Sequence, residues 1–301
     1  MDEFLQHWIN GLSLGCIYAL VALGYTLVFG VLSLINFAHG EMVMLGAYVG
    51  MYSARYFGLS ANPSITSLGI TLLFSMAVCA AMGFIIERFA YRPLRRAPRI
   101  NLLITAVGVS LFLQFSGQLV FGSAPQFFPE VLTFNLDHWK LNELQFNPLQ
   151  ITVLVVAFVL TFILQTVVFR SQWGRAMRAV SYNEDLAKLM GIPTDRVISS
   201  TFMVGAALAG AAGVLVGMVY PKIDPLMGSI LGLKSFVAAV VGGIGNMSGA
   251  VLGALILGLS EEFVTGYLNP SYRDAIAFAF LIVILLVKPS GILGENRVEK
   301  V

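Results

Sequence analysis

The chain has 301 residues, of which 57% are apolar and only 11% are charged, with a net charge of +2. Its mean hydropathy is +0.83. A soluble domain carries about 25% charged residues because water must solvate its surface. This composition therefore excludes a soluble domain and indicates a membrane protein. The two cysteines, Cys16 and Cys79, are too few for a disulfide framework or a cysteine-based zinc site.

Polar, glycine and proline positions separate the chain into nine apolar segments. A helix that crosses the bilayer needs roughly 20 apolar residues. We expect helices at 9–33, 41–58, 66–86, 101–121, 149–169, 198–219, 229–244, 249–267 and 273–288. The segments 41–58 and 229–244 are short and contain glycine, so each is either a full span or a half-helix. The predicted fold class is all-α: a polytopic transmembrane helical bundle of eight or nine hydrophobic helices, forming a single domain over 1–301.

Basic residues predict the orientation, because loops rich in lysine and arginine stay in the cytoplasm. The segments 87–100 and 170–197 each carry five basic residues and the C-terminal tail carries three, which together make 13 of the 18 in the chain. The segment 122–148 carries Lys140 against three acidic residues. We expect the basic segments and the C-terminus inside and 122–148 outside. Counting back three crossings places the N-terminus outside, provided that 41–58 crosses fully.

Small residues four positions apart indicate closely packed helices. They occur at Gly11 and Gly15, at Gly249 and Gly253, and in the run Gly205, Ala209, Gly213 and Gly217. In lipid such residues let helix backbones approach one another. The run after Gly205 is also compatible with a glycine-lined path or a hinge. The stretch from Gly11 to Gly15 matches a nucleophile-elbow pattern, but that motif requires a preceding strand, so we interpret it as packing.

Two polar breaks interrupt the apolar segments and are candidates for a translocation path. Polar groups at membrane depth are costly unless they are paired or face water. The candidate residues are Asn36, Phe37, His39, Glu41, Gly242, Gly243 and Asn246. The alternatives are a short turn at the headgroup level for the first break and a tight hairpin for the second. Glu41 is the ionisable residue well inside the apolar stretches, whereas we interpret Glu261 and Glu262 as a solvated rim.

A short helix is predicted inside the basic segment 170–197, between Ser181 and Pro193. Ser181 and Glu184 fit a capping box, and Asn183 is an alternative N-cap. Gly191 suits the position that follows a helix end. Apolar residues three and four positions apart form one face, consisting of Leu186, Leu189 and Met190. This helix either lies on the lipid surface or binds a groove in a partner.

The stretch GRAMRAVSYNEDLAKLMGIPTDRVISSTFMVGAALAGAAGVL resembles the cytoplasmic coupling region of bacterial ABC importer permeases. The stretches GLSLGCIYALVALGYTLVFGVLSLINFAHGEMVMLGAYVG and FVAAVVGGIGNMSGAVLGALILGLSEE are similar to the permeases for branched-chain amino acids. Among the two permeases of such systems the chain looks like the shorter subunit.

This resemblance implies a permease subunit in the bacterial inner membrane, working with a second homologous permease. It further implies two cytoplasmic ABC ATPase subunits that hydrolyse ATP and an extracytoplasmic amino-acid-binding protein. The residues that would contact the ATPase are Glu184, Leu186, Ala187, Leu189, Met190 and Gly191. The chain itself is expected to be no enzyme and to bind no cofactor, metal or nucleic acid, since its glycine-rich run 242–245 lacks the lysine of a phosphate-binding loop.

Two alternatives stay open at the level of sequence. The same kind of importer could carry urea, short amides or other amino acids, because its binding protein selects the substrate. The more distant alternative is an autonomous secondary carrier, which usually places coupled ionisable groups in the membrane. Glu41 has no obvious partner in the sequence, which disfavours a carrier.

Overall fold

A computed structural model of the chain describes residues 2–95, 97–133, 140–141, 144–145 and 147–294. The α-helices are α1 (Asp2–Leu32), α2 (His39–Tyr56), α3 (Ile65–Ile86), α4 (Arg99–Phe121), α5 (Pro148–Arg170), α6 (Gln172–Tyr182), α7 (Glu184–Leu189), α8 (Thr194–Val219), α9 (Met227–Gly242), α10 (Met247–Tyr267) and α11 (Arg273–Val287). A π-helical turn, η2 (Glu87–Tyr91), continues α3, and short 3-10 turns form η1 (Leu59–Ala61), η3 (Arg92–Leu94) and η5 (Pro270–Tyr272). The strands are β1 (Gln126–Phe127), β2 (Lys140–Leu141), β3 (Leu144–Gln145) and β4 (Lys222–Ile223); β1 pairs with β4 and β2 with β3, both antiparallel.

All nine predicted helices are present, which confirms the all-α transmembrane bundle. In the described part of the chain, seven helical segments are long and apolar enough to cross a membrane. Of the nine predicted helices, the two outside that group are α2 and α9, with 18 and 16 residues, which correspond to the predicted half-helix candidates. Helix α6 is not among the predicted helices, because its buried residues, Gly174, Met177 and Val180, lie on one side of an otherwise polar helix.

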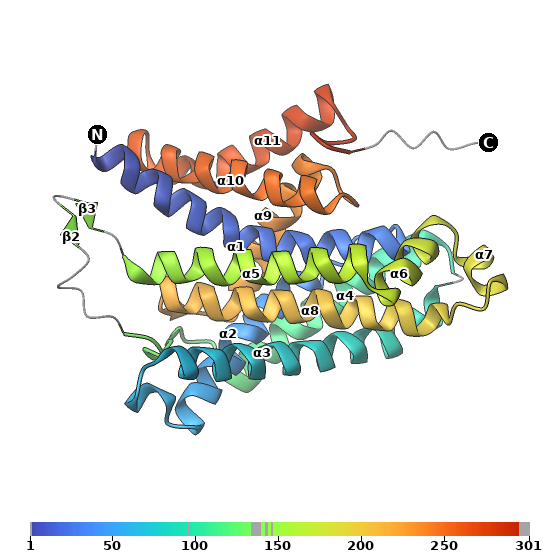
Figure 1. Cartoon of the computed structure of the whole chain (residues 1–301), viewed down its shortest axis with the longest axis horizontal. Helices are drawn as coiled ribbons and strands as arrows, with labels where there is room; N and C mark the ends of the chain where they lie inside the picture. The colour runs from blue at the N-terminus through green and yellow to red at the C-terminus, as the bar shows by residue number, and fades with distance from the viewer. Residues whose placement is uncertain (1, 96, 134–139, 142–143, 146, 295–301) are drawn as a thin grey trace.

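The bundle is built around α1 and α8, which are its most deeply buried long helices. Helix α8 packs against α1, α2 and α3, while α1 also packs against α9 and α10. Helices α6 and α7 lie at one end of the bundle, and β2, β3 and the start of α1 lie at the other (Figure 1). The outer helices α4, α5 and α11 expose many apolar side chains, as expected for surfaces that face lipid or another membrane subunit.

Glycines at the helix contacts confirm the predicted packing positions. A Cβ atom on Gly11 would lie 2.9 Å from the Leu259 Cα atom, and one on Gly15 would lie 2.9 Å from the Leu255 Cα atom. These contacts bring α1 and α10 together backbone to backbone. Without a hydrophobic force between helices in lipid, such close approach is what holds them in contact.

Helix α2 begins deep inside the bundle and not at its end. The His39 Nε2 atom lies 3.2 Å from the backbone oxygen of Val21 on α1. Val21 precedes the last residue of α1 by 11 positions, which corresponds to about 16 Å along the helix axis. The segment 33–38 therefore turns back into the bundle.

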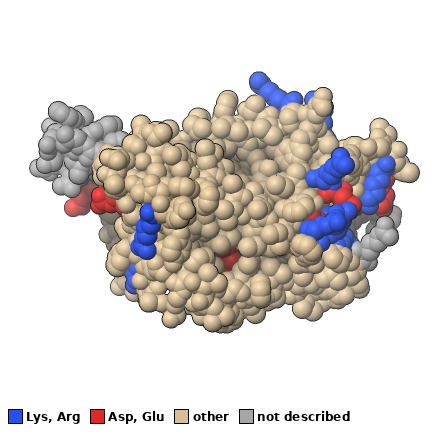
Figure 2. Space-filling view, turned by 90° about the horizontal axis from the view of Figure 1, so that it is seen from below, with Lys and Arg blue, Asp and Glu red and all other residues tan. Residues whose placement is uncertain are grey.

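Charged side chains gather toward the ends of the molecule, and the middle of the face in Figure 2 is almost uncharged.

Candidate functional site

Helix α7 is a self-contained unit of six residues with a defined beginning. Its N-cap is Asn183, whose side-chain oxygen accepts hydrogen bonds from the backbone N–H groups of Asp185 and Leu186, both at 3.0 Å. The predicted capping box that begins at Ser181 does not form, because Ser181 lies inside α6, and the alternative N-cap Asn183 is the one observed. Lys188 pairs with Glu184 one turn earlier, at 2.6 Å.

The end of α7 is equally well defined. Gly191 has a φ of +80°, which is the left-handed region that glycine adopts without steric cost. Its N–H group donates to the Lys188 oxygen, and the Ile192 N–H group donates to the Ala187 oxygen, both at 3.0 Å. This pair of bonds is a Schellman motif. The geometry predicted for Gly191 is confirmed.

The predicted apolar face of α7 is exposed. Leu186, Leu189 and Met190 are 54%, 83% and 82% exposed, respectively. Ala187 is only 3% exposed and packs inside the protein. Its predicted contact with the ATPase is therefore wrong, and its side chain instead packs α7 against the rest of the chain. The helix therefore offers a small apolar surface on one side and is anchored on the other.

The amphipathic helix α6 attaches α7 to the bundle. Ser171 caps α6 by accepting a hydrogen bond from the Gly174 N–H group at 3.0 Å. The indole N–H group of Trp173 donates to the Ser200 hydroxyl on α8 at 2.6 Å, and Met177 and Val180 are buried beneath the helix. Helix α6 therefore joins α7 to the long helix α8.

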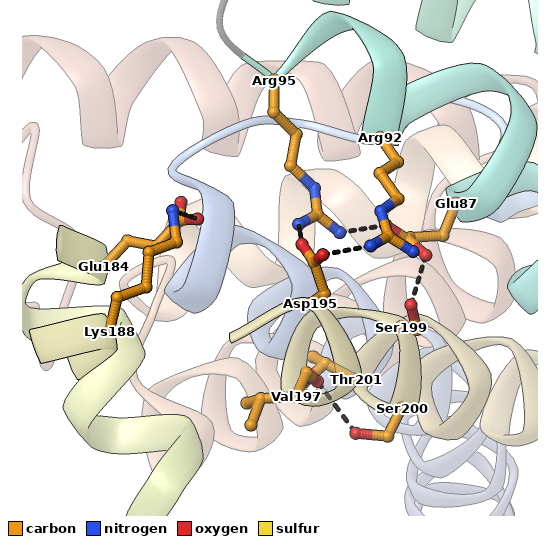
Figure 3. Close-up of polar contacts among 10 residues, drawn as sticks. All are labelled: Glu87, Arg92, Arg95, Glu184, Lys188, Asp195, Val197, Ser199, Ser200 and Thr201. Atoms are coloured by element: carbon orange, nitrogen blue, oxygen red, sulfur yellow. Dashed lines mark hydrogen bonds and ion pairs between the residues drawn. The ribbon is translucent and has the colours of Figure 1, made fainter. Parts of the chain in front are cut away.

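A charged network connects the turn after α3 to the start of α8 (Figure 3). Arg95 pairs with the buried carboxylate of Glu87 and, at 2.8 Å, with Asp195. Arg92 also pairs with Asp195, and the hydroxyl of Ser199 donates to Glu87. These contacts join η2, η3 and α8. A cleft of about 1190 Å³ lies between this network and α7, and its lining includes Arg92, Arg95, Asp195 and Ser199 together with Glu184 and Lys188 of α7.

The first polar break, residues 36–41, lies in the protein interior. The side chains of Asn36 and His39 there contact other residues of the same chain. The Asn36 side-chain oxygen accepts from the Tyr91 hydroxyl at 2.7 Å and from the Ala38 N–H group at 3.1 Å. The ring of His39 packs edge-on against Tyr25. Phe37 is only partly buried and packs against the core. The contribution of these residues to a path stays a prediction.

Glu41 has a different environment from the rest of this break. Its residue is 1% exposed, and its Oε1 atom accepts from the Ser229 hydroxyl on α9 at 2.9 Å and from the Ser110 hydroxyl on α4 at 3.4 Å. Its Oε2 atom has no hydrogen-bond partner among the described residues. The sequence suggested no partner for Glu41, and the structure supplies two hydroxyl groups.

The second polar break has the geometry of a tight helical hairpin. The Asn246 side chain caps α10 through the Gly249 N–H group at 3.1 Å and donates to the Leu293 oxygen at 2.8 Å. The Leu293 N–H group in turn donates to the Gly242 oxygen at 2.9 Å. A Cβ atom on Gly243 would meet the Gly294 backbone. These contacts favour the hairpin interpretation over a path at this break.

Sequence reasoning missed a buried ionic network between α9, α10 and α11. Glu261 is fully buried, so its interpretation as a solvated rim is wrong. It pairs with Lys234 at 3.0 Å and with Arg273 at 2.9 Å, and Lys234 also pairs with Asp274 at 2.7 Å. Tyr18 on α1 donates to the same carboxylate at 2.9 Å. Lys234, a lone basic residue within an apolar segment, was the available signal.

Comparison with known proteins supports one family for nearly the whole chain. The high-affinity branched-chain amino acid transport system permease protein LivH of Escherichia coli K12 is 42% identical, over 99% of this chain and 98% of its own length. The corresponding BraD protein of Pseudomonas aeruginosa is 41% identical over the same shares. The permease protein LivM of Escherichia coli K12 is 23% identical, over 95% of this chain and 69% of its own length.

The family model for the permease component of branched-chain amino acid transport systems matches residues 8–285, which include α1 from residue 8 onward, all of α2 to α10 and nearly all of α11. This match extends well beyond the segment 170–197. The chain therefore belongs to the family of branched-chain amino acid transport system permease components.

Proposed function

We propose that the chain is the transmembrane permease subunit of an ATP-driven, binding-protein-dependent importer. The observation that carries this proposal is α7, which presents three exposed apolar side chains at the end of the bundle. Isolated helices of fewer than about 12 residues are marginal in water. A partner groove would cover this apolar face, and the fixed contact between α6 and α8 would transmit the movement of that partner.

The proposed partner at α7 is a cytoplasmic ATPase subunit, and the complete assembly contains two of them. ATP is hydrolysed on those subunits, and this chain binds no cofactor. A second permease completes the membrane core, in line with the resemblance to both LivH and LivM. An extracytoplasmic amino-acid-binding protein delivers the substrate.

We propose leucine, isoleucine and valine as substrates, because LivH and BraD are named as permeases of high-affinity branched-chain amino acid transport systems. Uptake by the assembled complex in vesicles tests this. We expect leucine uptake that requires ATP and the binding protein, and that unlabelled valine suppresses. Inhibition by urea or acetamide but not by valine would contradict the proposed substrate while leaving the importer class intact.

Substitution of Leu189 tests the ATPase contact. We expect L189D to reduce both co-purification of the ATPase subunits and transport, because it places a charge in an apolar contact. The control L189M keeps the volume and polarity and should behave as the unaltered chain. If L189D weakens the contact of α7 with the lipid surface but leaves co-purification of the ATPase subunits unchanged, α7 is a membrane-surface helix and the coupling assignment is wrong.

A further inference from the structure

The three buried carboxylates of the described chain differ in their partners. Glu87 pairs with Arg95, and Glu261 pairs with Lys234 and Arg273. Among the described residues, Glu41 has no basic group within 4 Å, its side chain accepts hydrogen bonds only from the hydroxyls of two serines, and one of its oxygens has no hydrogen-bond partner. A buried carboxylate without a cation is unfavourable, so the presence of Glu41 in the interior requires an explanation.

Glu41 lies where two helices begin in the interior of the bundle. A Cβ atom on Gly40 of α2 would lie 2.7 Å from the Gly228 oxygen of α9, and one on Gly228 would lie 2.7 Å from the free Glu41 oxygen. The glycines therefore leave room beside that oxygen that any larger residue would fill. Glu41 follows His39, whose contact with Val21 places this region about 16 Å from the end of α1.

A series of hydrogen bonds connects Glu41 to the protein surface between α4 and α9. Ser229 donates to Glu41 and is itself exposed, and the Gln114 amide donates to the Ser229 hydroxyl at 3.1 Å. Exposed polar groups at this depth are costly against lipid, so this surface faces water or another membrane subunit. A solute between two permease subunits would meet these groups first and Glu41 behind them.

We propose that Glu41, with Ser110 and Ser229, forms a site for the α-ammonium group of an amino acid in transit through the membrane. An amino acid enters as a zwitterion, and its ammonium group needs an anionic partner once it leaves water. Glu41 is the buried carboxylate that lacks a cation of its own. The proposal rests on the proposed function, and it assigns Glu41 a role that the neighbouring Asn36 and His39 do not share.

The isosteric substitution E41Q removes the charge but keeps an oxygen that accepts from both serines. In the complex with its partner permease, ATPases and binding protein, we expect E41Q to lower kcat/KM for leucine uptake about tenfold or more, since bonds to charged groups are the strong ones. The variant E41D, which keeps the carboxylate, should retain more leucine uptake than E41Q. The matched control E262Q alters a carboxylate held by His7 and Asn10 and should leave uptake unchanged.

A second experiment does not depend on the folding of E41Q. With Cys16 replaced by serine, S229C is labelled in the complex by cationic and anionic methanethiosulfonates of similar size. We expect faster labelling by the cationic reagent and slower labelling by both when leucine and the binding protein are present. Equal rates without protection, or full leucine uptake by E41Q, would overturn the proposal. If the unaltered complex carries no leucine, it is the proposed function that fails.

Discussion

Gly191 illustrates a requirement set by the backbone of one residue. Nothing lies within 4 Å of the position that a Cβ atom would occupy, so the space around Gly191 is open to a larger side chain. Its φ of +80° is the constraint, because a left-handed conformation costs most L-residues about 1–2 kcal/mol and β-branched residues more. The Schellman bonds that end α7 depend on this conformation.

We therefore expect G191V to loosen the end of α7 and to weaken ATPase binding. The control G191N should retain binding, because asparagine tolerates the left-handed region better than other non-glycine residues do. Hydrogen exchange over residues 184–192, measured together with co-purification of the ATPase, checks this expectation. Equal protection and equal binding for the valine and asparagine variants would show that the conformation at this position is unimportant.

At the scale of elements, the contacts that join η2, η3 and α8 depend unequally on Arg92 and Arg95. Arg95 is 10% exposed and pairs with the fully buried Glu87, whereas Arg92 is 33% exposed and pairs with the half-exposed Asp195. Removing one member of a buried pair leaves an uncompensated charge and costs about 3–5 kcal/mol. An exposed pair contributes about 0–1 kcal/mol.

We expect R95A to lower the thermal unfolding midpoint of the purified chain in detergent, and R92A to lower it much less. The double variant R95A/E87Q should recover part of the loss, because it removes the unpaired charge together with its partner. Unfolding curves recorded under one detergent condition give the comparison. Similar midpoints for R95A and R92A would mean that the buried pair does not hold these elements together.

At the scale of the whole molecule, the two ends of the bundle should face opposite sides of the membrane. Helices α6 and α7 lie at one end and the start of α1 lies at the other (Figure 1). Tyr182 is the last residue of α6, and η5 follows the end of α10, where Tyr267 contacts His7 near the start of α1. Tyr182 is 85% exposed, and Ser271 in η5 is also exposed. The basic segments belong to the end with Tyr182, so the positive-inside rule assigns that end to the cytoplasm.

Cysteine labelling in intact cells measures this orientation. We expect an impermeant maleimide to modify S271C in intact cells and Y182C only after the cells are opened. The background carries serine at Cys16, and Cys79 is fully buried. Modification of Y182C in intact cells would reverse the assigned orientation, including the outer position of the N-terminus.

Properties that depend on neighbouring residues along the chain could be predicted from the sequence. The nine apolar helices follow from the length that a bilayer requires. The cap at Asn183 and the left-handed Gly191 follow from backbone groups that a helix leaves unpaired at its ends. The glycines at 11 and 15 indicated close packing because small residues drive contact in lipid. In each case, the residues that carry the signal lie in the same helix or helix end whose structure they predict.

Contacts between distant segments could only come from the tertiary structure. Glu41 meets Ser229 across 188 positions, and Glu261 meets Tyr18 across 243, so no local pattern distinguishes the carboxylate without a cation from the one that is paired. Likewise, the burial of Ala187 depends on how α6 and α8 hold α7. The sequence determined which segments enter the membrane and that α7 ends at a left-handed Gly191, and it left Asn183 as one of two candidate N-caps. The tertiary structure decided which charges are compensated, because in a low-dielectric interior that depends on the few ångströms around each charge.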